Sequence, residues 1–438
     1  MAYNFYETIL LVVLTLSLVL KIPINVFNKL FFVGTLIFLI LADFNAINLL
    51  EWQGFIKVLC IIFGLIIINL GNSHVLSSSH ALIFCVIVAS SIMVSTNNLL
   101  ALYICLELQS LSIFILIARK KSKLNKIEAS LKYFVLSSIS TGLYLLGASI
   151  VFVNLGTCDY SNIIDQSNSL EKSLIIVALL FKLGASPFHF WIPDVYQGSD
   201  NKALLILTTL PKISVFGILV LLFPNNTLIL ISAVMSLIIG SLGAINQSYL
   251  NRLLAYSGIM AIGFVLLGLG LETVKGVEGS CTYLIIYTIT FLLLIVGSNS
   301  IFNENVLIAE FSNVLSQSKI LTIILALSIL SMAGIPPLGG FLAKWVVISS
   351  AISSGFILLS VLSVTCAVVA GAYYLRLVKI IYFQQDKHFL LWRKILLPNK
   401  IGINNIIALG MISYLIVFIL IFPQAISQII YWVSISVF

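Results

Sequence analysis

The sequence predicts an all-α polytopic membrane protein with about 14 transmembrane helices and two inverted five-helix repeats, each containing a proline-broken helix. Three observations carry this prediction. The composition is far too apolar for a soluble domain, because 61% of the 438 residues are hydrophobic, 9% are charged and the mean hydropathy is +1.17. The apolar residues form runs of about 20, the length that crosses a bilayer. Two of these runs are interrupted by glycine and proline.

The apolar runs place the expected helices along the whole chain. They cover residues 5–20, 29–42, 55–70, 80–95, 98–118, 129–154, 174–198, 203–223, 227–246, 252–271, 281–302, 319–352, 357–383 and 404–422. The last run, 425–438, fits either an interfacial helix or a further span. No cleaved signal is expected, because the first run continues into the next span without a basic n-region or a small-residue cleavage site.

Basic residues divide unevenly between the two sides that this helix order creates. The loops after odd-numbered helices carry most of them, including the cluster Arg119–Lys126, whereas the other side carries only Lys57, Lys172 and Lys275. Such an excess marks the inner side of a membrane protein, so both termini are expected on the outer side. Docking of a partner is the alternative for the Arg119–Lys126 cluster. The asymmetry also explains the net charge of +8 without nucleic-acid binding.

Two spans carry proline near their middle, at Pro187 in the first and at Pro336 and Pro337 in the second. Proline removes a backbone donor and collides with the preceding turn, so each helix should break there. Each break falls in the fourth span of a set of five. Because five is odd, the second set crosses the bilayer in the opposite sense, which is typical of an inverted repeat; two unrelated kinks are the alternative.

Four domains follow from this arrangement. We expect N-terminal helices 1–3 in residues 1–79, the first repeat with helices 4–8 in 80–223, and the second repeat with helices 9–13 in 227–383. The rest, 384–438, is expected to form an inner-side loop, helix 14 and a C-terminal tail.

Four ionisable residues lie inside apolar runs: Glu107, Lys182, Lys212 and Lys344. Each costs roughly 2.5–3.5 kcal/mol on insertion scales, so a function is expected. Burial disfavours a charged amine and a nearby carboxylate favours it, so a lysine can release its proton when its partner moves. The four residues are therefore candidates for proton transfer. The alternatives are a static ion pair for Glu107 and Lys182, snorkelling for Lys212, and an interfacial anchor for Lys344.

Cofactor sites are not expected in this chain. The six cysteines are dispersed without a C-x-x-C pair, and the four histidines do not pair as haem ligands. Neither a P-loop nor a dinucleotide-binding glycine motif occurs. We predict no metal site and no cofactor-binding site.

Five strings occur in order between residues 80 and 385: Leu106–Leu111 (LELQSL), Glu128–Phe134 (EASLKYF), Lys182–Tyr196 (KLGASPFHFWIPDVY), Arg252–Ser257 (RLLAYS) and Ala333–Lys344 (AGIPPLGGFLAK). They resemble the antiporter-like, proton-translocating subunits of respiratory NADH:ubiquinone oxidoreductase, complex I. The LELQSL form, with lysine at position 344, is similar to subunit 2 of that complex. Single motifs are shared with Mrp-type cation/proton antiporters.

The resemblance implies fourteen helices, inverted repeats, outward termini and proton translocation coupled to redox chemistry in other subunits. Glu107 resembles the carboxylate that pairs with Lys182, Lys212 the central relay lysine and Lys344 the terminal one. NADH, FMN, iron–sulfur clusters and ubiquinone are implied only in partner subunits. The implied partners are the other membrane-arm subunits of complex I and lipids, with protons as the transported species and no nucleic acid.

One position departs from the family, because Ala261 stands where its members commonly have a histidine. Water or a hydroxyl such as that of Tyr256 must bridge this point, or the proton path is interrupted. His189, beyond Pro187, either organises water or is a structural histidine. A stand-alone Mrp-type antiporter and a non-conducting assembly scaffold are the alternative functions.

The expected location is the mitochondrial inner membrane, as a multi-pass protein with both termini on the intermembrane-space side. Only four arginines stand against 19 lysines, and isoleucine, asparagine and serine abound, as expected from an AT-rich organellar gene. A bacterial plasma membrane is the alternative.

Overall fold

The computed structural model describes residues 51–70, 78–119, 124–160, 169–222, 227–302, 306–314, 318–384 and 403–437. Within these ranges the chain is helical and contains no strand. The helices expected at 5–20 and 29–42 and most of the inner-side loop lie outside the described residues.

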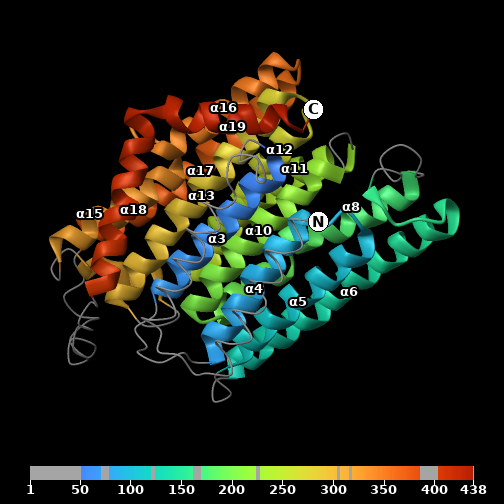
Figure 1. Cartoon of the computed structure of the whole chain (residues 1–438). Helices are drawn as coiled ribbons and strands as arrows, with labels where there is room; N and C mark the ends of the chain where they lie inside the picture. The colour runs from blue at the N-terminus through green and yellow to red at the C-terminus, as the bar shows by residue number, and fades with distance from the viewer. Residues whose placement is uncertain are drawn as a thin grey trace, which may run out of the picture. The chain divides into compact units, whose positions relative to one another are not determined.

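The described helices lie where the apolar runs predict them (Figure 1). Seven of those in the described ranges are long and apolar enough to cross a membrane: α5 (Leu99–Ala118), α6 (Leu124–Leu155), α10 (Asn201–Leu222), α11 (Thr227–Ala244), α12 (Leu250–Leu269), α13 (Val274–Ile301) and α17 (Ile357–Phe383). The others include α3 (Trp52–Asn69), α4 (Ser78–Ser95), α18 (Ile403–Ile421), α19 (Pro423–Ile435) and the 3-10 helix η1 (Ile308–Asn313). The protein is thus an all-helical polytopic membrane protein in its described part.

The two proline-containing spans are each divided into two helices. The first comprises α8 (Ser169–Leu183) and α9 (Trp191–Gly198), and the second comprises α15 (Lys319–Ala333) and α16 (Gly339–Ser353). Each upstream helix is followed by a glycine with a left-handed backbone, Gly184 with φ +73° and Gly334 with φ +80°. Glycine adopts this conformation without the steric cost that a Cβ brings.

The structure divides into two compact units. The first contains the described residues within 1–183, 202–224 and 432–438. In it α3 packs on α4, α4 on α5, α5 on α6 and α6 on α8. The indole N–H of Trp52 donates to the carbonyl of Gly217 on α10 at 2.9 Å, and its ring meets Phe216 edge-on. Aromatic and polar contacts therefore fasten α3 to α10.

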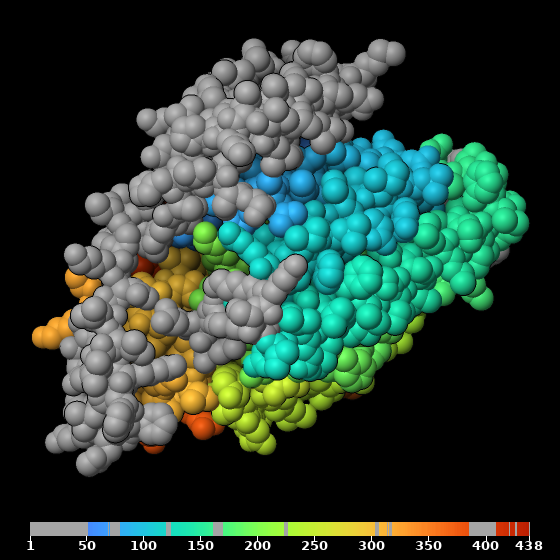
Figure 2. Space-filling view, turned by 90° about the horizontal axis from the view of Figure 1, so that it is seen from below, coloured from blue at the N-terminus to red at the C-terminus, as the bar shows by residue number. Residues whose placement is uncertain are grey.

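The outer faces of α5 and α6 carry exposed apolar side chains. Residues 100–155 occupy much of the face seen in Figure 2, coloured from cyan to green. The exposed residues include Ile104, Leu111, Leu131, Ile139 and Phe152. Lipid tails suit such a face, because its side chains are apolar and the backbone groups in the interior of a helix bond to one another.

The second unit contains the described residues within 184–201 and 225–431. Its centre is formed by α12 and α13, whose apolar stretches are about nine-tenths buried. Helix α11 packs on α12, α13 contacts α15, α16 and α18, and α17 contacts α11, α15 and α16. Two glycines allow the close approach of α11 and α12, because a Cβ on Gly240 would lie 2.5 Å from the backbone nitrogen of Met260, and one on Gly263 would lie 2.9 Å from that of Leu237.

Among the described residues, each unit contains one isolated backbone bridge. In the first, Asn98 before α5 pairs with Asp159 after α6, and in the second, Tyr249 before α12 pairs with Leu307 after α13. Both bridges close the same kind of pair, two long successive helices that lead into a broken span.

Candidate functional site

The first unit contains the carboxylate and two of the three lysines that the sequence singles out. Glu107 lies on α5, and its Oε2 accepts a hydrogen bond from the Ser110 hydroxyl at 3.3 Å. Its charge acts on the amine of Lys182, near the end of α8. That Nζ atom is buried and has no hydrogen bond to the described residues. Glu107 and Lys182 thus interact through their charges without a direct hydrogen bond.

Lys212 lies on α10, which is buried along nearly its whole length. The side chain is only 3% exposed, and its Nζ is buried, so it does not snorkel to the surface of the structure. Pro211 precedes it inside the helix and supplies no N–H to the carbonyl one turn earlier. Gln109 of α5 donates to the Ser214 hydroxyl at 3.4 Å. This bond links the α5 turn that carries Glu107 to the α10 turn that carries Lys212.

Lys344 lies in the second unit, on α16 just after the helix break. Its amine donates to the carbonyl of Ala333, the last residue of α15, at 2.7 Å and lies 5.9 Å from the centre of the Phe264 ring. The residue is 6% exposed, whereas its neighbour Trp345 is 59% exposed. An interfacial anchor extends its charge toward water, and the Lys344 side chain instead turns into the unit.

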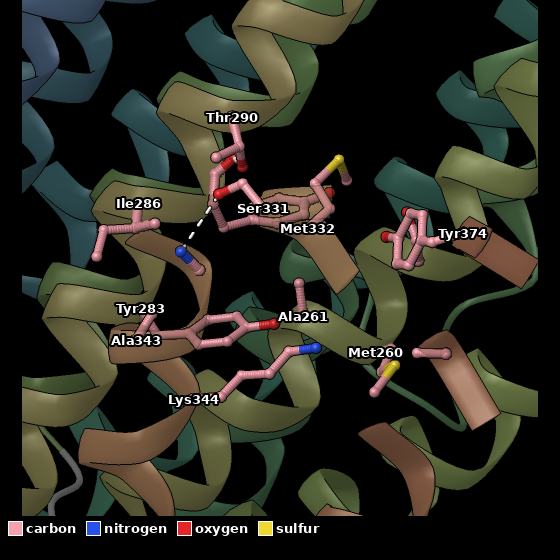
Figure 3. A pocket seen from close by; sticks show the side chains of 14 residues that line it. Met260, Ala261, Tyr283, Ile286, Thr290, Ser331, Met332, Ala343, Lys344 and Tyr374 are labelled. Atoms are coloured by element: carbon pink, nitrogen blue, oxygen red, sulfur yellow. Dashed lines mark hydrogen bonds between the residues drawn. The ribbon is translucent and has the colours of Figure 1, made fainter. Parts of the chain in front are cut away.

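A cavity of about 20 Å³, measured as space open to the centres of water molecules, adjoins Lys344 in the second unit. Figure 3 shows the Tyr283 ring and the Lys344 side chain reaching into it, with Ala261 on its wall. Its polar lining residues come from α12, α13, α15, α16 and α17, namely Ser257, Tyr283, Tyr287, Thr290, Ser331, Lys344 and Tyr374.

Tyr256 and His189 lie apart from the lining of this cavity. The Tyr256 ring packs against α11, because a Cβ on Gly243 would come within 2.5 Å of its Cδ1 atom. His189 is buried in the turn after Pro187 and stacks on Phe190 at 4.8 Å between ring centroids. The hydroxyl on the same lining as Ala261 is thus that of Ser257, the residue that follows Tyr256.

Further polar residues of the site escape notice in the sequence. Tyr283 and Tyr374 lie in apolar runs, where an aromatic residue is typical of a packed core. The only available signal is the phenol hydroxyl, which needs a partner when buried.

Arg252 of α12 forms an ion pair with Asp194 of α9 at 2.8 Å. This pair fastens the second half of the first broken span to α12.

No metal-binding cluster of three or more histidine, cysteine, aspartate or glutamate side chains occurs in the described residues.

The sequence matches a family model described as "NADH:quinone oxidoreductase/Mrp antiporter, TM" over residues 96–370. Chain 2 of NADH-ubiquinone oxidoreductase from Metridium senile is 40% identical over 375 residues, covering 82% of this chain and 97% of the relative. Subunit N of NADH-quinone oxidoreductase from Hydrogenovibrio crunogenus is 38% identical over 317 residues, covering 68% of this chain and 66% of the relative.

Solved structures share the fold. A chain of respiratory complex I from Thermus thermophilus superposes with a TM-score of 0.82 at 24% identity, covering 97% of this chain and 98% of that one. A chain of the Mrp complex from Dietzia superposes with a TM-score of 0.77 at 16% identity, covering 87% and 83%. The family match spans more than half of the sequence and both cited relatives exceed 30% identity, so the chain belongs to the family of NADH:quinone oxidoreductase and Mrp antiporter membrane subunits.

Proposed function

We propose that this chain is a membrane-arm subunit of NADH:quinone oxidoreductase and translocates protons through its buried glutamate and lysines. The observation that carries the proposal is the buried amine of Lys182, which forms no hydrogen bond to the described residues and on which the charge of Glu107 acts. The names of the relatives from Metridium senile and Hydrogenovibrio crunogenus support the choice of complex. The redox chemistry, with NADH, FMN, iron–sulfur clusters and ubiquinone, belongs to partner subunits.

Glu107 and Lys182 form the switch in this proposal. A carboxylate stabilises the charged amine, and burial in a low-dielectric surrounding opposes it. Displacement of Glu107, or a change in its charge, therefore leaves the Lys182 ammonium without compensation, and the proton is released. We assign the intermediate carrier to Lys212 and the terminal carrier to Lys344.

The same proposal includes fourteen spans in two inverted repeats. Supporting it, both broken spans follow a pair of long helices closed by a backbone bridge, and a left-handed glycine follows the upstream half of each break. We place the protein in the mitochondrial inner membrane with both termini in the intermembrane space. The charge asymmetry of the loops and the relative from Metridium senile support this location.

Glu107→Gln and Lys182→Met test the switch in the complex reconstituted into liposomes. Each variant removes one member of the charge pair while keeping its shape and volume nearly unchanged. The number of protons pumped per electron should fall by the share that this subunit carries, while electron transfer to quinone continues. Acidification of the vesicle lumen, measured together with NADH oxidation, gives this ratio.

The matched controls are Glu128→Gln and Lys132→Met. These residues form an ion pair at 2.7 Å on the exposed side of α6, where such a pair contributes little. Both controls should pump like the unaltered complex. An unchanged ratio of protons to electrons in Glu107→Gln and Lys182→Met would refute the switch.

A stand-alone cation/proton antiporter is the second candidate, favoured by the structural likeness to the Mrp complex. Blue-native electrophoresis with an in-gel NADH oxidation stain separates the two. Migration of the chain in a large NADH-oxidising assembly supports the first function. Migration without that activity, together with cation-driven proton exchange in vesicles, supports the antiporter.

A further inference from the structure

A buried hydrogen bond between two side chains joins α5 to α10 in the first unit. The Gln109 amide nitrogen donates to the Ser214 hydroxyl oxygen at 3.4 Å, and both residues are buried. The Ser214 hydroxyl donates its own proton to the Leu210 carbonyl at 3.0 Å, so it meets Gln109 as an acceptor. Leaving a buried amide without its partner costs more than the bond itself contributes. The two helices are therefore expected to move together at this contact.

The segment of α10 that carries Lys212 is the part of this helix that bends most readily. Pro211 supplies no N–H to the carbonyl one turn earlier. Hydroxyls bond back to carbonyls of the preceding turn at Thr208, Thr209 and Ser214. Such bonds often bend a helix. Beyond this segment the helix is held again, because the Trp52 indole of α3 donates to the Gly217 carbonyl.

On α5, Glu107 and Gln109 belong to one helical turn. Their side chains lie on nearly opposite sides of the helix, because two positions rotate a side chain by about 200°. The Ser110 hydroxyl donates both to Oε2 of Glu107 at 3.3 Å and to its backbone carbonyl at 3.0 Å. This hydroxyl ties the carboxylate to the turn that carries it. A displacement of the carboxylate therefore moves the turn, and Gln109 with it.

We propose that Gln109 is a positioning residue that transmits a movement of the Glu107 turn, through Ser214, to Lys212. The inference rests on the proposed function, in which Glu107 changes its charge or position. When the turn shifts, the Gln109–Ser214 bond pulls the weakened segment of α10 and brings the Lys212 amine to where it receives the proton that Lys182 releases. One ammonium loses this proton and one neutral amine gains it, whereas Gln109 and Ser214 neither gain nor lose one.

Gln109→Met in the complete complex, reconstituted into liposomes, tests the connection. Methionine keeps the length and the volume of glutamine but has no N–H to donate. The number of protons pumped per electron should fall toward the value of Lys212→Met, while NADH oxidation continues and the melting temperature changes little. A side chain that only fills space between the two helices would leave this ratio unchanged.

Ser214→Ala breaks the same bond from the other helix and repeats the test if Gln109→Met does not assemble. It should lower the pumping ratio as Gln109→Met does, and the double variant should pump no less than either single one, because both changes remove one bond. The matched control is Thr208→Val. It also removes a buried α10 hydroxyl, but one that bonds to the Leu205 carbonyl of its own helix. Its pumping ratio should stay normal.

Combination with Lys212→Met shows whether Gln109 acts through this lysine. Gln109→Met should cause no further loss of pumping in a complex that already carries Lys212→Met. A further loss there, normal pumping in Gln109→Met, or an equal loss in Thr208→Val would overturn the inference.

Lys212→Met alone separates this inference from the proposed function. If Lys212→Met pumps normally, then the role of Lys212 as a proton carrier is wrong, and Gln109 has nothing to position. If Lys212→Met loses pumping and Gln109→Met keeps it, then only the connection through Gln109 is wrong.

Discussion

Two buried lysines are stabilised by different partners. The negative charge of Glu107 acts on the Lys182 amine, and the charge and position of this glutamate can change. Lys344 instead donates to the backbone carbonyl of Ala333. That carbonyl is available because α15 ends there, and the last carbonyls of a helix have no helical donor. A carboxylate can be neutralised and a carbonyl cannot, so we propose that Lys182 responds to a change of charge and Lys344 to a change of geometry.

Gly334 controls the geometry of Lys344. A Cβ at this position would lie 2.8 Å from Cδ and 2.9 Å from Nζ of Lys344. Gly334→Ala should therefore displace the amine from the Ala333 carbonyl, in addition to about 1–3 kcal/mol of strain from a left-handed alanine. We expect a lower melting temperature and a loss of proton pumping, measured by thermal denaturation of the purified complex and by vesicle acidification.

Gly355→Ala provides the comparison for this variant. Gly355 has φ +85°, but an added Cβ there meets no atom within 4 Å. It should show the backbone strain alone, with a small loss of stability and normal pumping. If both variants lose pumping equally, the contact between Gly334 and Lys344 is not what matters.

The sequence identifies charged residues of the site more readily than hydroxyls. Lys344 stands out because an amine in an apolar run requires an explanation. Tyr374 does not, since a phenol in such a run packs like any aromatic residue. To predict that Ser257 rather than Tyr256 lines the cavity, one must know which side of α12 faces its neighbours. The sequence does not give this, and successive residues of a helix point about 100° apart.

Small residues govern how closely α11 and α12 approach. Membrane helices gain little from the hydrophobic effect against each other, so close packing of backbones replaces it. Gly240→Ala should destabilise the protein by about 1–3 kcal/mol, as overpacking typically does, because its Cβ would meet the Met260 backbone at 2.5 Å. A thermal-shift assay in detergent measures the change.

Gly142→Ala should have the opposite sign. Gly142 lies on α6 with no atom within 4 Å of an added Cβ, and alanine favours a helix by about 1 kcal/mol over glycine. Its melting temperature should therefore stay level or rise. A loss of stability in Gly142→Ala would show that helix propensity does not decide the effect at this site.

The positions of the helices are the part of the structure that the sequence predicts best. Runs of about 20 apolar residues locate α10, α12 and α17 almost to their ends, and proline locates the interruptions that follow α8 and α15. Where each break begins depends on the left-handed glycines Gly184 and Gly334, whose role only the backbone reveals. The short η1 has no apolar period, so no pattern predicts it.

The proposed topology of the whole protein can be tested at the two ends of α12. Asn246 and Glu272 are exposed residues that flank this helix. On the fourteen-span arrangement, Asn246 faces the inner side and Glu272 the outer side. A membrane-impermeant maleimide added to right-side-out membranes should label Glu272→Cys and not Asn246→Cys.

Inside-out membranes should reverse this labelling pattern. The background is low, because the described cysteines are buried apart from the partly exposed Cys85. Labelling of both variants from one side would remove the basis for the inverted repeats. An apolar helix looks the same in the sequence whichever way it crosses the membrane. The predicted orientation therefore rests on the lysines and arginines of the loops rather than on the fold.

The length of α6 has a consequence for the lipid environment. Its 32 residues extend about 48 Å at 1.5 Å per residue, against about 30 Å of hydrocarbon. Such a rod must lean or protrude, and its slope depends on how thick the surrounding bilayer is. Since α6 packs on α8, which carries Lys182, a thinner or thicker membrane shifts the support beneath that amine. The acyl-chain length of the host membrane should therefore affect the activity of this protein.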